Sequence, residues 1–304
     1  MPKVALVMST YNGEKFLEKQ LESLFQQEGV ELTIYVRDDL STDSTFTILK
    51  KNSDRLIIID NKDTNLGVGN SFMEALYFVG TNYDYYAFCD QDDIWLPDKL
   101  SRGISFLNHP EKPQLYNSNQ ELVDDKLNSL GLRHNQSLDV SPLQILTNNK
   151  ITGCTMVWNK KLQELLLDPQ RRPSSEVLKV RIQDVWVSMV ASLVGDVFYD
   201  PESRIKYRQH DNNVVGVRVE SRASLWKKKL FNSEKQQGRS KLAIAILQGY
   251  NDLLKKPDLE MISVYANYSR DLKSKWRLLS DKMLSAKSTE PRYQFVIKVL
   301  LNLV

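Results

Sequence analysis

Short apolar runs alternate with amphipathic stretches throughout the first 110 residues, and this alternation limits what the chain can fold into. Such an order is typical of strand–helix–strand units, which build a mostly parallel sheet. The amphipathic stretches repeat apolar residues at helical spacing, whereas the short apolar runs have the length of strands. Strands are predicted at residues 4–8, 32–36, 56–60 and 85–89, and helices at 15–26, 44–51, from the 65–67 turn to Val79, and from Pro97 onward.

The rest of the chain follows a less regular pattern. Between residues 114 and 209 strands and helices mix, with 116–118 following a strand, a helix at 183–193 and a short strand at 204–209. After about residue 220 the pattern becomes helical, with helices expected at 242–254, 261–279 and 293–304. The predicted fold class is α/β, a mostly parallel Rossmann-like sheet flanked by helices, with a C-terminal helical extension.

Charge divides the chain into two parts. From Arg218 to the C-terminus it holds 18 Lys and Arg against 8 Asp and Glu, whereas the preceding 217 residues hold 23 against 30. We therefore expect an acidic catalytic domain at residues 1–217 and a basic helical region at 218–304 that meets something anionic, such as a membrane surface. Residues 226–231 mix aromatic and basic side chains, as interfacial segments do. The alternative is that solvated lysines flank helices packed on the catalytic domain or on a second subunit of a homodimer.

Features that the sequence lacks indicate the cellular compartment. No apolar stretch approaches the roughly 20 residues of a membrane span, and the run at 4–8 is too short for a secretory signal. Cys89 and Cys154 offer neither a disulfide framework nor the spacing of a zinc site. We expect a cytoplasmic protein that can associate with the inner face of the plasma membrane.

Three predicted strands end in polar or acidic loops: Ser9-Thr10, Asp38-Asp39 and Asp90-Gln91-Asp92-Asp93. In open α/β sheets, ligands bind beyond the carboxyl ends of the strands. Carboxylates crowded there repel one another unless a cation lies among them, and they suit Mg²⁺ or Mn²⁺ with diphosphate oxygens. The alternative is an acidic loop that caps the helix near Pro97. No GxGxxG or GxxxxGK[ST] phosphate cradle occurs, which disfavours a dehydrogenase or a P-loop enzyme.

Six motifs occur in one order, and together they resemble glycosyltransferase family 2, with its GT-A fold. The motifs are Ser9–Gly13 (STYNG), the Asp38-Asp39 pair, DQDDIW at 90–95, TGC at 152–154, QDVW at 183–186 and YRQH at 207–210. The resemblance covers about residues 3–216. The DQDDIW and YRQH-x-x-N forms look most like bacterial rhamnosyltransferases of cell-wall or capsular polysaccharide synthesis.

The resemblance implies a nucleoside site and a metal site. Thr10, Tyr11 and Asn12 would hold the donor nucleoside, with Asp39 on the base. Asp90 and Asp92 match the family's DxD element, with Asp92 the first choice as a direct ligand of Mg²⁺ or Mn²⁺.

Six further residues have candidate roles in such a site. Asp184 matches the general base of inverting members, although it also suits the N-terminus of a helix. His210 would reach the metal or the diphosphate, unless it is a surface or core histidine. Arg208 would pair with phosphate, or form a surface salt bridge. Gly153 would allow the backbone close to the sugar, or serve a tight turn. Trp95 and Trp186 could face a sugar ring, with core packing as the default.

The leading hypothesis is an inverting, metal-dependent transferase that moves L-rhamnose from dTDP-L-rhamnose onto a hydroxyl of a lipid-linked surface polysaccharide. A glucosyl- or galactosyltransferase that uses a UDP-sugar is an alternative within the same class. A non-catalytic nucleotide-sugar-binding scaffold is an alternative of another class, but binding alone would not require Asp184. Nucleic acid is not expected as a partner, because the front part of the chain is acidic and no recognition motif is present.

Overall fold

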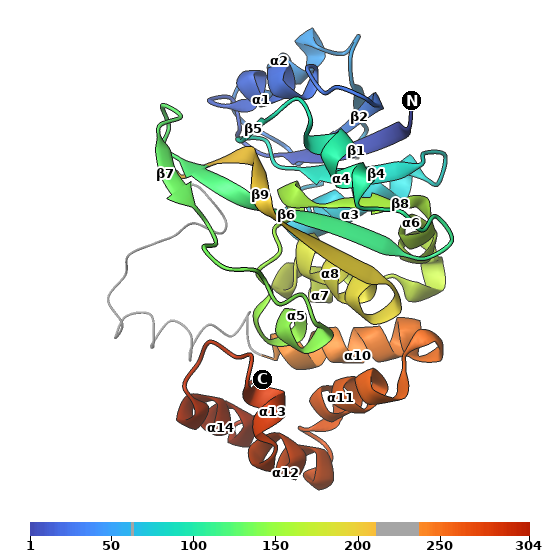
Figure 1. Ribbon diagram of the computed structural model, residues 1–304, viewed down its shortest axis with the longest axis vertical. Helices are drawn as coiled ribbons and strands as arrows, with labels where there is room; N and C mark the ends of the chain where they lie inside the picture. Colours follow the sequence, from blue (N-terminus) through green and yellow to red (C-terminus); the bar gives the residue numbers. More distant parts are fainter. Residues whose placement is uncertain (62–63, 211–236) are drawn as a thin grey trace.

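The computed structural model describes residues 1–61, 64–210 and 237–304 (Figure 1). Its strands are β1 (Lys3–Thr10), β2 (Glu31–Asp38), β3 (Ile57–Ile59), β4 (Tyr85–Cys89), β5 (Ile94–Trp95), β6 (Gln114–Val123), β7 (Ser129–Leu132), β8 (Val157–Asn159) and β9 (Asp196–Arg208). Its α-helices are α1 (Leu17–Leu24), α2 (Thr45–Lys51), α3 (Val68–Val79), α4 (Lys99–Ser105), α5 (Pro142–Asn148), α6 (Lys160–Leu167), α7 (Ser175–Val180), α8 (Gln183–Val194), α10 (Gly238–Tyr250), α11 (Lys256–Asn267), α12 (Leu272–Ser280), α13 (Lys282–Ser285) and α14 (Arg292–Leu300).

The strands form one sheet in the order β3-β2-β1-β4-β8-β6-β9-β5, and β7 pairs with β6. Strands β1 to β4 pair in parallel, as the alternating sequence pattern predicts, and the helices between them match the predicted segments. Beyond β4 the sheet becomes mixed: β8 is antiparallel to β4 and β6, whereas β6 and β9 are parallel. The predicted α/β class is confirmed.

Strand register places the three polar loops together. Thr10 lies opposite Asp38 in the β1–β2 pair, and Met8 lies opposite Cys89 in the β1–β4 pair. The carboxyl ends of β1, β2 and β4 therefore meet at one edge of the sheet. The loops at residues 9–13, 38–43 and 90–93 start there as neighbours.

Both faces of the sheet are buried, because β1 carries apolar residues at every interior position. Val4, Leu6 and Met8 face the cluster that includes α1, whereas Ala5 and Val7 face the cluster that includes α3 and α8. A run without alternating polar residues is expected for a parallel strand covered by helices on both sides. The two helical layers thus hold the strand ends, and the loops that follow them, in a fixed arrangement.

Three predictions of secondary structure need correction. Residues 116–118 lie inside β6, and the predicted strand at 204–209 is only the end of the thirteen-residue β9. The predicted helix at 261–279 is two helices, α11 and α12. Asp271 separates them, because its carboxylate accepts hydrogen bonds from the main-chain N–H groups of Lys273 and Ser274 and so begins a new helix.

The C-terminal helices continue the core of the sheet domain (Figure 1). Leu242, Ile246 and Tyr250 of α10 belong to the same apolar cluster as Trp186 of α8. The rings of Trp186 and Tyr250 lie 6.0 Å apart, so Trp186 packs in the core, its default interpretation; Trp95 is likewise buried. The predicted boundary at 217/218 and residues 226–231 lie outside the described residues. Among those described, no helix is long and apolar enough to cross a membrane.

Gly69 provides a test of the packing behind the site. An added Cβ at Gly69 would collide with the main-chain oxygen of Leu178, where α3 meets α7. Although alanine favours helix by about 0.5–1 kcal/mol, we expect Gly69→Ala to lower the free energy of unfolding by about 1–3 kcal/mol through overpacking. Gly153→Ala is the control, since its Cβ would meet no atom closer than 3.4 Å. Urea unfolding measures both; equal stability of the two variants would contradict the packing.

Candidate active site

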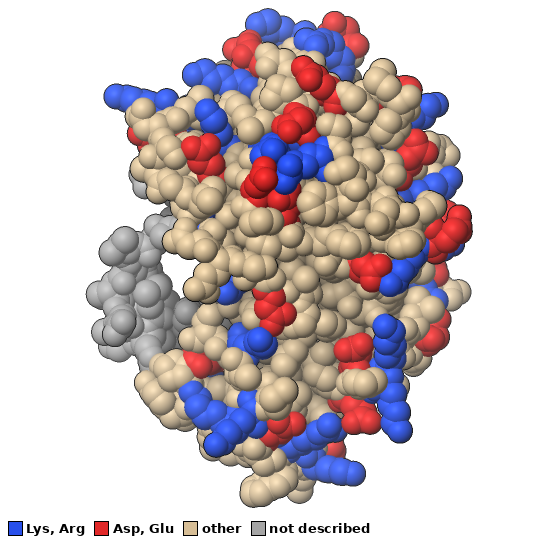
Figure 2. Space-filling model, in the orientation of Figure 1, with Lys and Arg blue, Asp and Glu red and all other residues tan. Residues whose placement is uncertain are grey.

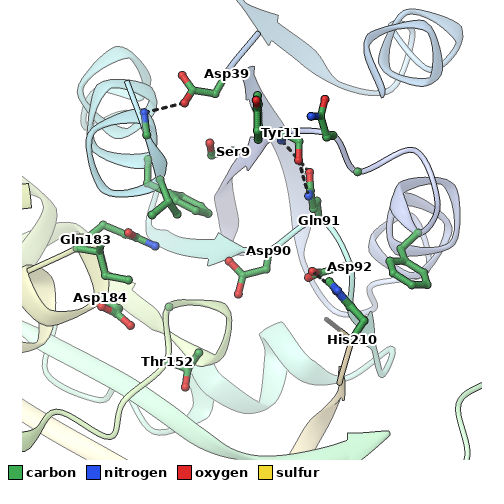
Figure 3. A pocket seen from close by; sticks show the side chains of 18 of the residues that line it. Ser9, Tyr11, Asp39, Asp90, Gln91, Asp92, Thr152, Gln183, Asp184 and His210 are labelled. Carbon is green, nitrogen blue, oxygen red and sulfur yellow. Dashed lines mark hydrogen bonds and ion pairs between the residues drawn. The ribbon is translucent and has the colours of Figure 1, made fainter. Parts of the chain in front are cut away.

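A pocket of about 830 Å³ lies at the carboxyl ends of β1, β2 and β4 (Figure 3). One wall is formed by the loops that follow these strands, and the other by residues 152–153 and the first turn of α8. Among the predicted site residues, its lining includes Tyr11, Asn12, Asp39, Asp90, Asp92, Gly153, Asp184 and His210. Three carboxylates that are far apart in the sequence, Asp39, Asp92 and Asp184, thus share one cavity.

Asp39 is fixed in the pocket wall by the protein itself. Its carboxylate accepts hydrogen bonds from the N–H groups of Leu66 at 2.9 Å and Gly67 at 2.8 Å, and pairs with the guanidinium of Arg37. These contacts fix the side chain in one orientation at the start of α3. A ligand N–H that meets Asp39 would find a preoriented acceptor.

The loop after β1 differs from the prediction. The hydroxyl of Thr10 is buried and donates to Asp38 at 2.8 Å, so Thr10 links β1 to β2 and does not line the pocket. The nucleoside contact predicted for Thr10 is therefore corrected. Asn12 lines the pocket, but its side-chain oxygen accepts the N–H of Thr42 at 2.8 Å and joins the loops after β1 and β2. Tyr11 is 51% exposed, which leaves its ring accessible to a ligand.

Gln91 is a contact that the sequence analysis missed. Its amide accepts the N–H of Tyr11 at 2.9 Å and donates to the carbonyl of Tyr11 at 3.0 Å. Gly13 lies beneath it, where a Cβ would collide with the Gln91 amide. Gln91 therefore ties residues 90–93, called the acidic loop below, to the loop after β1. The glycine of the STYNG motif is the sequence feature that could have indicated this close contact.

The acidic loop presents its three carboxylates in two directions. Asp90 and Asp92 line the pocket, whereas Asp93 is fully buried and accepts the main-chain N–H of Arg208 at 3.1 Å. Burial, and next the charge of Asp92, raises the pKa of Asp90 to about 7. The same two causes raise the pKa of Asp93 well above its usual range. Asp93 is thus part of the support of the loop, and Asp90 and Asp92 remain for a ligand.

His210 and Asp92 form a pair at the edge of the pocket (Figure 3). The Nε2 atom of His210 lies 2.8 Å from a carboxylate oxygen of Asp92. The imidazole ring packs 5.0 Å from the ring of Phe16, which keeps it turned toward the acidic loop. The sequence analysis paired these two residues through the metal, and the structure places them within direct hydrogen-bonding distance.

Arg208 supports the acidic loop from behind. Its guanidinium donates to the main-chain oxygens of Asp92 at 2.9 Å and Asp125 at 2.8 Å, and lies 4.5 Å from the ring of Phe16. The side chain is buried and does not line the pocket. The buried position does not match a surface salt bridge, and the phosphate contact stays a prediction. The pairing of β9 with β5 and with β6 brings these main-chain oxygens close to Arg208, and such contacts leave no local sequence signal.

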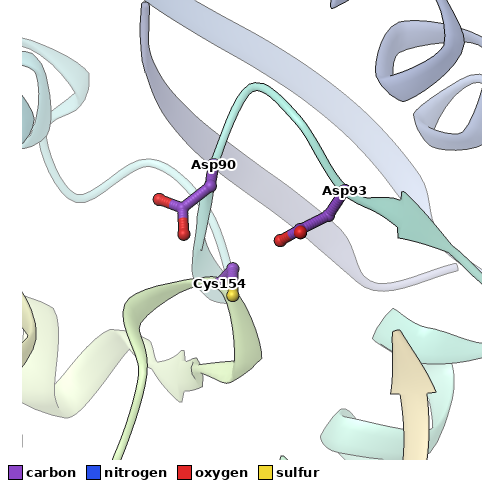
Figure 4. A group of neighbouring side chains, drawn as sticks. All are labelled: Asp90, Asp93 and Cys154. Carbon is purple, nitrogen blue, oxygen red and sulfur yellow. The ribbon is translucent and has the colours of Figure 1, made fainter. Parts of the chain in front are cut away.

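One group of described side chains brings its ligand atoms close enough together for a cation, and a second set of candidate ligands lines the pocket. Asp90, Asp93 and Cys154 bring ligand atoms within 4.8 Å of one another (Figure 4). Burial raises the pKa of the Cys154 thiol well above its usual range, and a neutral thiol is a poor ligand for Mg²⁺ or Mn²⁺. The pocket-facing set of Asp90, Asp92 and His210 offers carboxylate oxygens and an imidazole, which suit these ions better.

Asp184 lies in the first turn of α8 and faces the pocket (Figure 3). One carboxylate oxygen accepts the N–H of Val185 at 2.6 Å, so the helix-terminal interpretation describes its position. Burial raises its pKa to about 7, against the lowering effect of the Val185 hydrogen bond. A carboxylate with a pKa near neutrality can accept a proton from an alcohol at physiological pH, so helix terminus and general base are compatible.

Gln183, the residue before Asp184, completes this wall. It is 3% exposed, and its side-chain oxygen has no hydrogen-bond partner among the described residues. Gly153 lies opposite, where a Cβ would be 3.4 Å from the Gln183 amide. A buried amide oxygen without a partner is costly unless a ligand or water satisfies it. Although the QDVW motif contains Gln183, the sequence analysis assigned no role to this residue.

The fold and this pocket define a glycosyltransferase of the GT-A type. The chain belongs to glycosyl transferase family 2, whose model matches residues 5–166. It is 29% identical over 234 residues to the dTDP-rhamnosyl transferase RfbG of Shigella flexneri, which covers 71% of this chain and 76% of the relative. It is 27% identical over 152 residues to the Escherichia coli UDP-Glc:alpha-D-GlcNAc-diphosphoundecaprenol beta-1,3-glucosyltransferase WfgD, covering 50% of this chain and 56% of the relative.

Solved structures agree on the fold. TarS of S. aureus (residues 1–349), in complex with UDP-GlcNAc, superposes with a TM-score of 0.56 at 17% identity and covers 98% of this chain and 81% of that one. The mannosyltransferase PcManGT of Pyrobaculum calidifontis, in complex with GDP-Man and Mn²⁺, gives a TM-score of 0.51 at 14% identity and covers 99% and 86%.

Arg208→Lys separates support of the acidic loop from phosphate binding. Because lysine cannot reproduce the two-pronged contact with Asp92 and Asp125, we expect the free energy of unfolding to fall by about 2–3 kcal/mol. Arg204→Lys, on the same strand but in partly exposed ion pairs, is the control and should cost less than about 1 kcal/mol. Thermal unfolding and donor KM are measured together. Unchanged stability with a raised donor KM would instead indicate a phosphate contact.

Proposed function

We propose that this glycosyltransferase is an inverting rhamnosyltransferase, which moves L-rhamnose from dTDP-L-rhamnose onto a hydroxyl of a lipid-linked saccharide in the assembly of a bacterial surface polysaccharide. The observation that carries the proposal is the single pocket that Asp39, Asp92 and Asp184 share. The name of the Shigella relative supports the rhamnosyl donor. The proposed reaction takes place at the cytoplasmic face of the membrane.

The proposed reaction assigns a role to each wall of the pocket. The nucleoside would lie along Tyr11 and Asn12, with Asp39 on the base. The acceptor hydroxyl would lie at Asp184, whose carboxylate takes the hydroxyl proton as the oxygen bonds to the anomeric carbon. The bond from that carbon to the diphosphate breaks on the opposite face, and the nucleoside diphosphate leaves with the bonding electrons. Attack and departure on opposite faces invert the anomeric centre.

A divalent metal fits the wall that the strand-end loops form. Asp90 and Asp92 line this wall together, and burial and next the charge of Asp92 raise the pKa of Asp90. Asp92, with Asp90 and His210, would hold Mg²⁺ or Mn²⁺. Such an ion would supply charge neutralisation for the departing diphosphate. The Pyrobaculum structure with Mn²⁺ supports this on the same fold.

A UDP-sugar remains the alternative donor. The E. coli relative is named for UDP-Glc, and the TarS complex contains UDP-GlcNAc. A glucosyl- or galactosyltransferase would use the same three carboxylates, so the alternatives differ only in the nucleoside and the hexose.

Asp184→Asn tests the general base. We expect kcat to fall by at least about a hundredfold, because an amide cannot take the proton, while the Kd for the donor stays within a few-fold. In the wild type, kcat should rise as the pH rises through about 7, since only the deprotonated carboxylate acts. Glu176→Gln, an equal charge change on exposed α7, is the control. Normal turnover by Asp184→Asn would exclude Asp184 as the base. A wild type that binds the donor without turning it over would instead favour a binding scaffold.

Donor and metal are tested in one experiment. Calorimetry with dTDP-L-rhamnose, UDP-glucose and UDP-galactose is run with Mg²⁺, with Mn²⁺ and with EDTA. We expect dTDP-L-rhamnose to bind at least about tenfold more tightly than the UDP-sugars, and EDTA to remove turnover until metal is restored. Asp92→Asn should weaken the binding of Mn²⁺ when the ion is titrated without donor. Preference for a UDP-sugar would replace the rhamnosyl proposal, and full turnover in EDTA would end the metal assignment.

A further inference from the structure

The surface of the C-terminal helices is unusually apolar. Sixteen large apolar side chains are exposed in the described residues. Seven of them lie in the segment 272–301, which contains α12, α13 and α14. They are Leu272, Trp276, Met283, Tyr293, Ile297, Leu300 and Leu301. Leu272 is 84% exposed and Trp276 is 71% exposed. Single exposed apolar residues need no explanation, but a concentration of this kind marks an interaction site.

Helical spacing places these residues on faces that point away from the core. Leu272 and Trp276 are four residues apart on α12, whose buried residue is Leu278. On α14 the exposed positions 293, 297, 300 and 301 repeat at helical spacing, and Phe295 and Val299 face inward. The two helices contact each other, and the ammonium of Lys275 donates to the main-chain oxygen of residue 300. Their exposed faces thus belong to one end of the molecule (Figure 1).

The same end is basic. Residues 270–298 hold eight Lys and Arg against three Asp and Glu. Each acid is occupied within the protein: Asp271 and Asp281 cap α12 and α13, and Glu290 pairs with Arg239 and Lys298. Arg277 and Lys287 are also paired, with Glu260 and Asp139. Lys273 and Lys282, by contrast, are exposed next to Leu272 and Met283. Figure 2 shows blue side chains, with a few red ones among them, around tan surface at this lower end of the molecule.

We propose that α12, α13 and α14 form a docking surface for an anionic lipid bilayer, in which the seven apolar side chains enter the interface and the flanking Lys and Arg meet the headgroups. Apolar residues beside basic ones are what interfacial helices use, and each basic residue near an anionic surface contributes about 1 kcal/mol. A second copy of this chain fits less well, because a symmetric contact would bring two basic surfaces together.

This surface is connected to the proposed base. Gly238 at the start of α10 packs against Arg181, three residues before Asp184. The helices beyond α10 therefore lie on the side of the sheet from which α8 presents Asp184 (Figure 1). The inference deepens the proposed function, in which the acceptor is lipid-linked: docking through α12 to α14 would hold the Asp184 wall toward the membrane that carries the acceptor.

Vesicle sedimentation of the full chain tests the proposal without substrate. The probes are vesicles of phosphatidylcholine alone and of an equimolar mixture with phosphatidylglycerol. We expect the protein to sediment with the anionic vesicles, less so at high salt, and to remain in solution with phosphatidylcholine. The double variant Leu272→Ser, Trp276→Ser should partition at least about tenfold more weakly. The control Leu130→Ser, Leu132→Ser removes two exposed leucines of β7, 59% and 47% exposed, and should bind as the wild type does.

Three outcomes would overturn the proposal. These are a wild type that ignores anionic vesicles, a double variant that binds as well as the wild type, and a wild-type dimer in light scattering that the double variant converts to a monomer. The last would assign the surface to self-association. Thermal unfolding verifies that the variant is folded, and transfer to a soluble acceptor is assayed separately. Loss of vesicle binding with normal transfer, or the reverse, distinguishes failure of the docking surface from failure of the proposed reaction.

Discussion

Repulsion among the carboxylates of the acidic loop is the constraint on which the site depends. Three aspartates lie within four residues at a buried strand end, where charges interact strongly because water is largely excluded. The protein disperses them by turning Asp93 inward, where its raised pKa favours the neutral form. Behind the loop, the buried ammonium of Lys99 lies 3.5 Å from the ring of Trp95 and adds a nearby positive charge. What remains in the pocket is a pair of carboxylates suited to a cation.

Positioning of this pair depends on contacts from the whole sheet. Gln91 ties the loop to the end of β1, and Arg208 ties it to the end of β9. Asp39 is held in the same way at the start of α3 by two main-chain N–H groups. Asp184 comes from α8, which packs in the same helical layer as α3. The pocket is thus a set of fixed polar groups on rigid elements, which is the arrangement that stabilises charge without reorganisation.

The secondary-structure elements that depend on local sequence patterns could be predicted from the sequence. Strands β1 to β4, the helices between them and the family were predictable because apolar periodicity and strand-end motifs are short-range signals. The contacts of Thr10 and Arg208 were not, because they depend on which strand lies alongside and on main-chain groups more than eighty residues away. Gln183 was missed for a related reason: an unpaired amide in a cavity appears only when its surroundings are known. The roles assigned to Asp39, Asp92, Asp184 and His210 stay predictions.

The contact between Trp186 and Tyr250 bears on how such enzymes diversify. Tyr250 also donates from its hydroxyl to the carbonyl of Leu165, so α10 is anchored to two elements of the sheet domain. A recombination event that exchanged the C-terminal segment at α10 would uncover the apolar back of the helix that carries Asp184. The outer helices α12 to α14 lie beyond this junction and can change their surface without that penalty. Single substitutions on the surface of α12 to α14 can therefore change what the molecule docks onto, while the domain that forms the pocket stays the same.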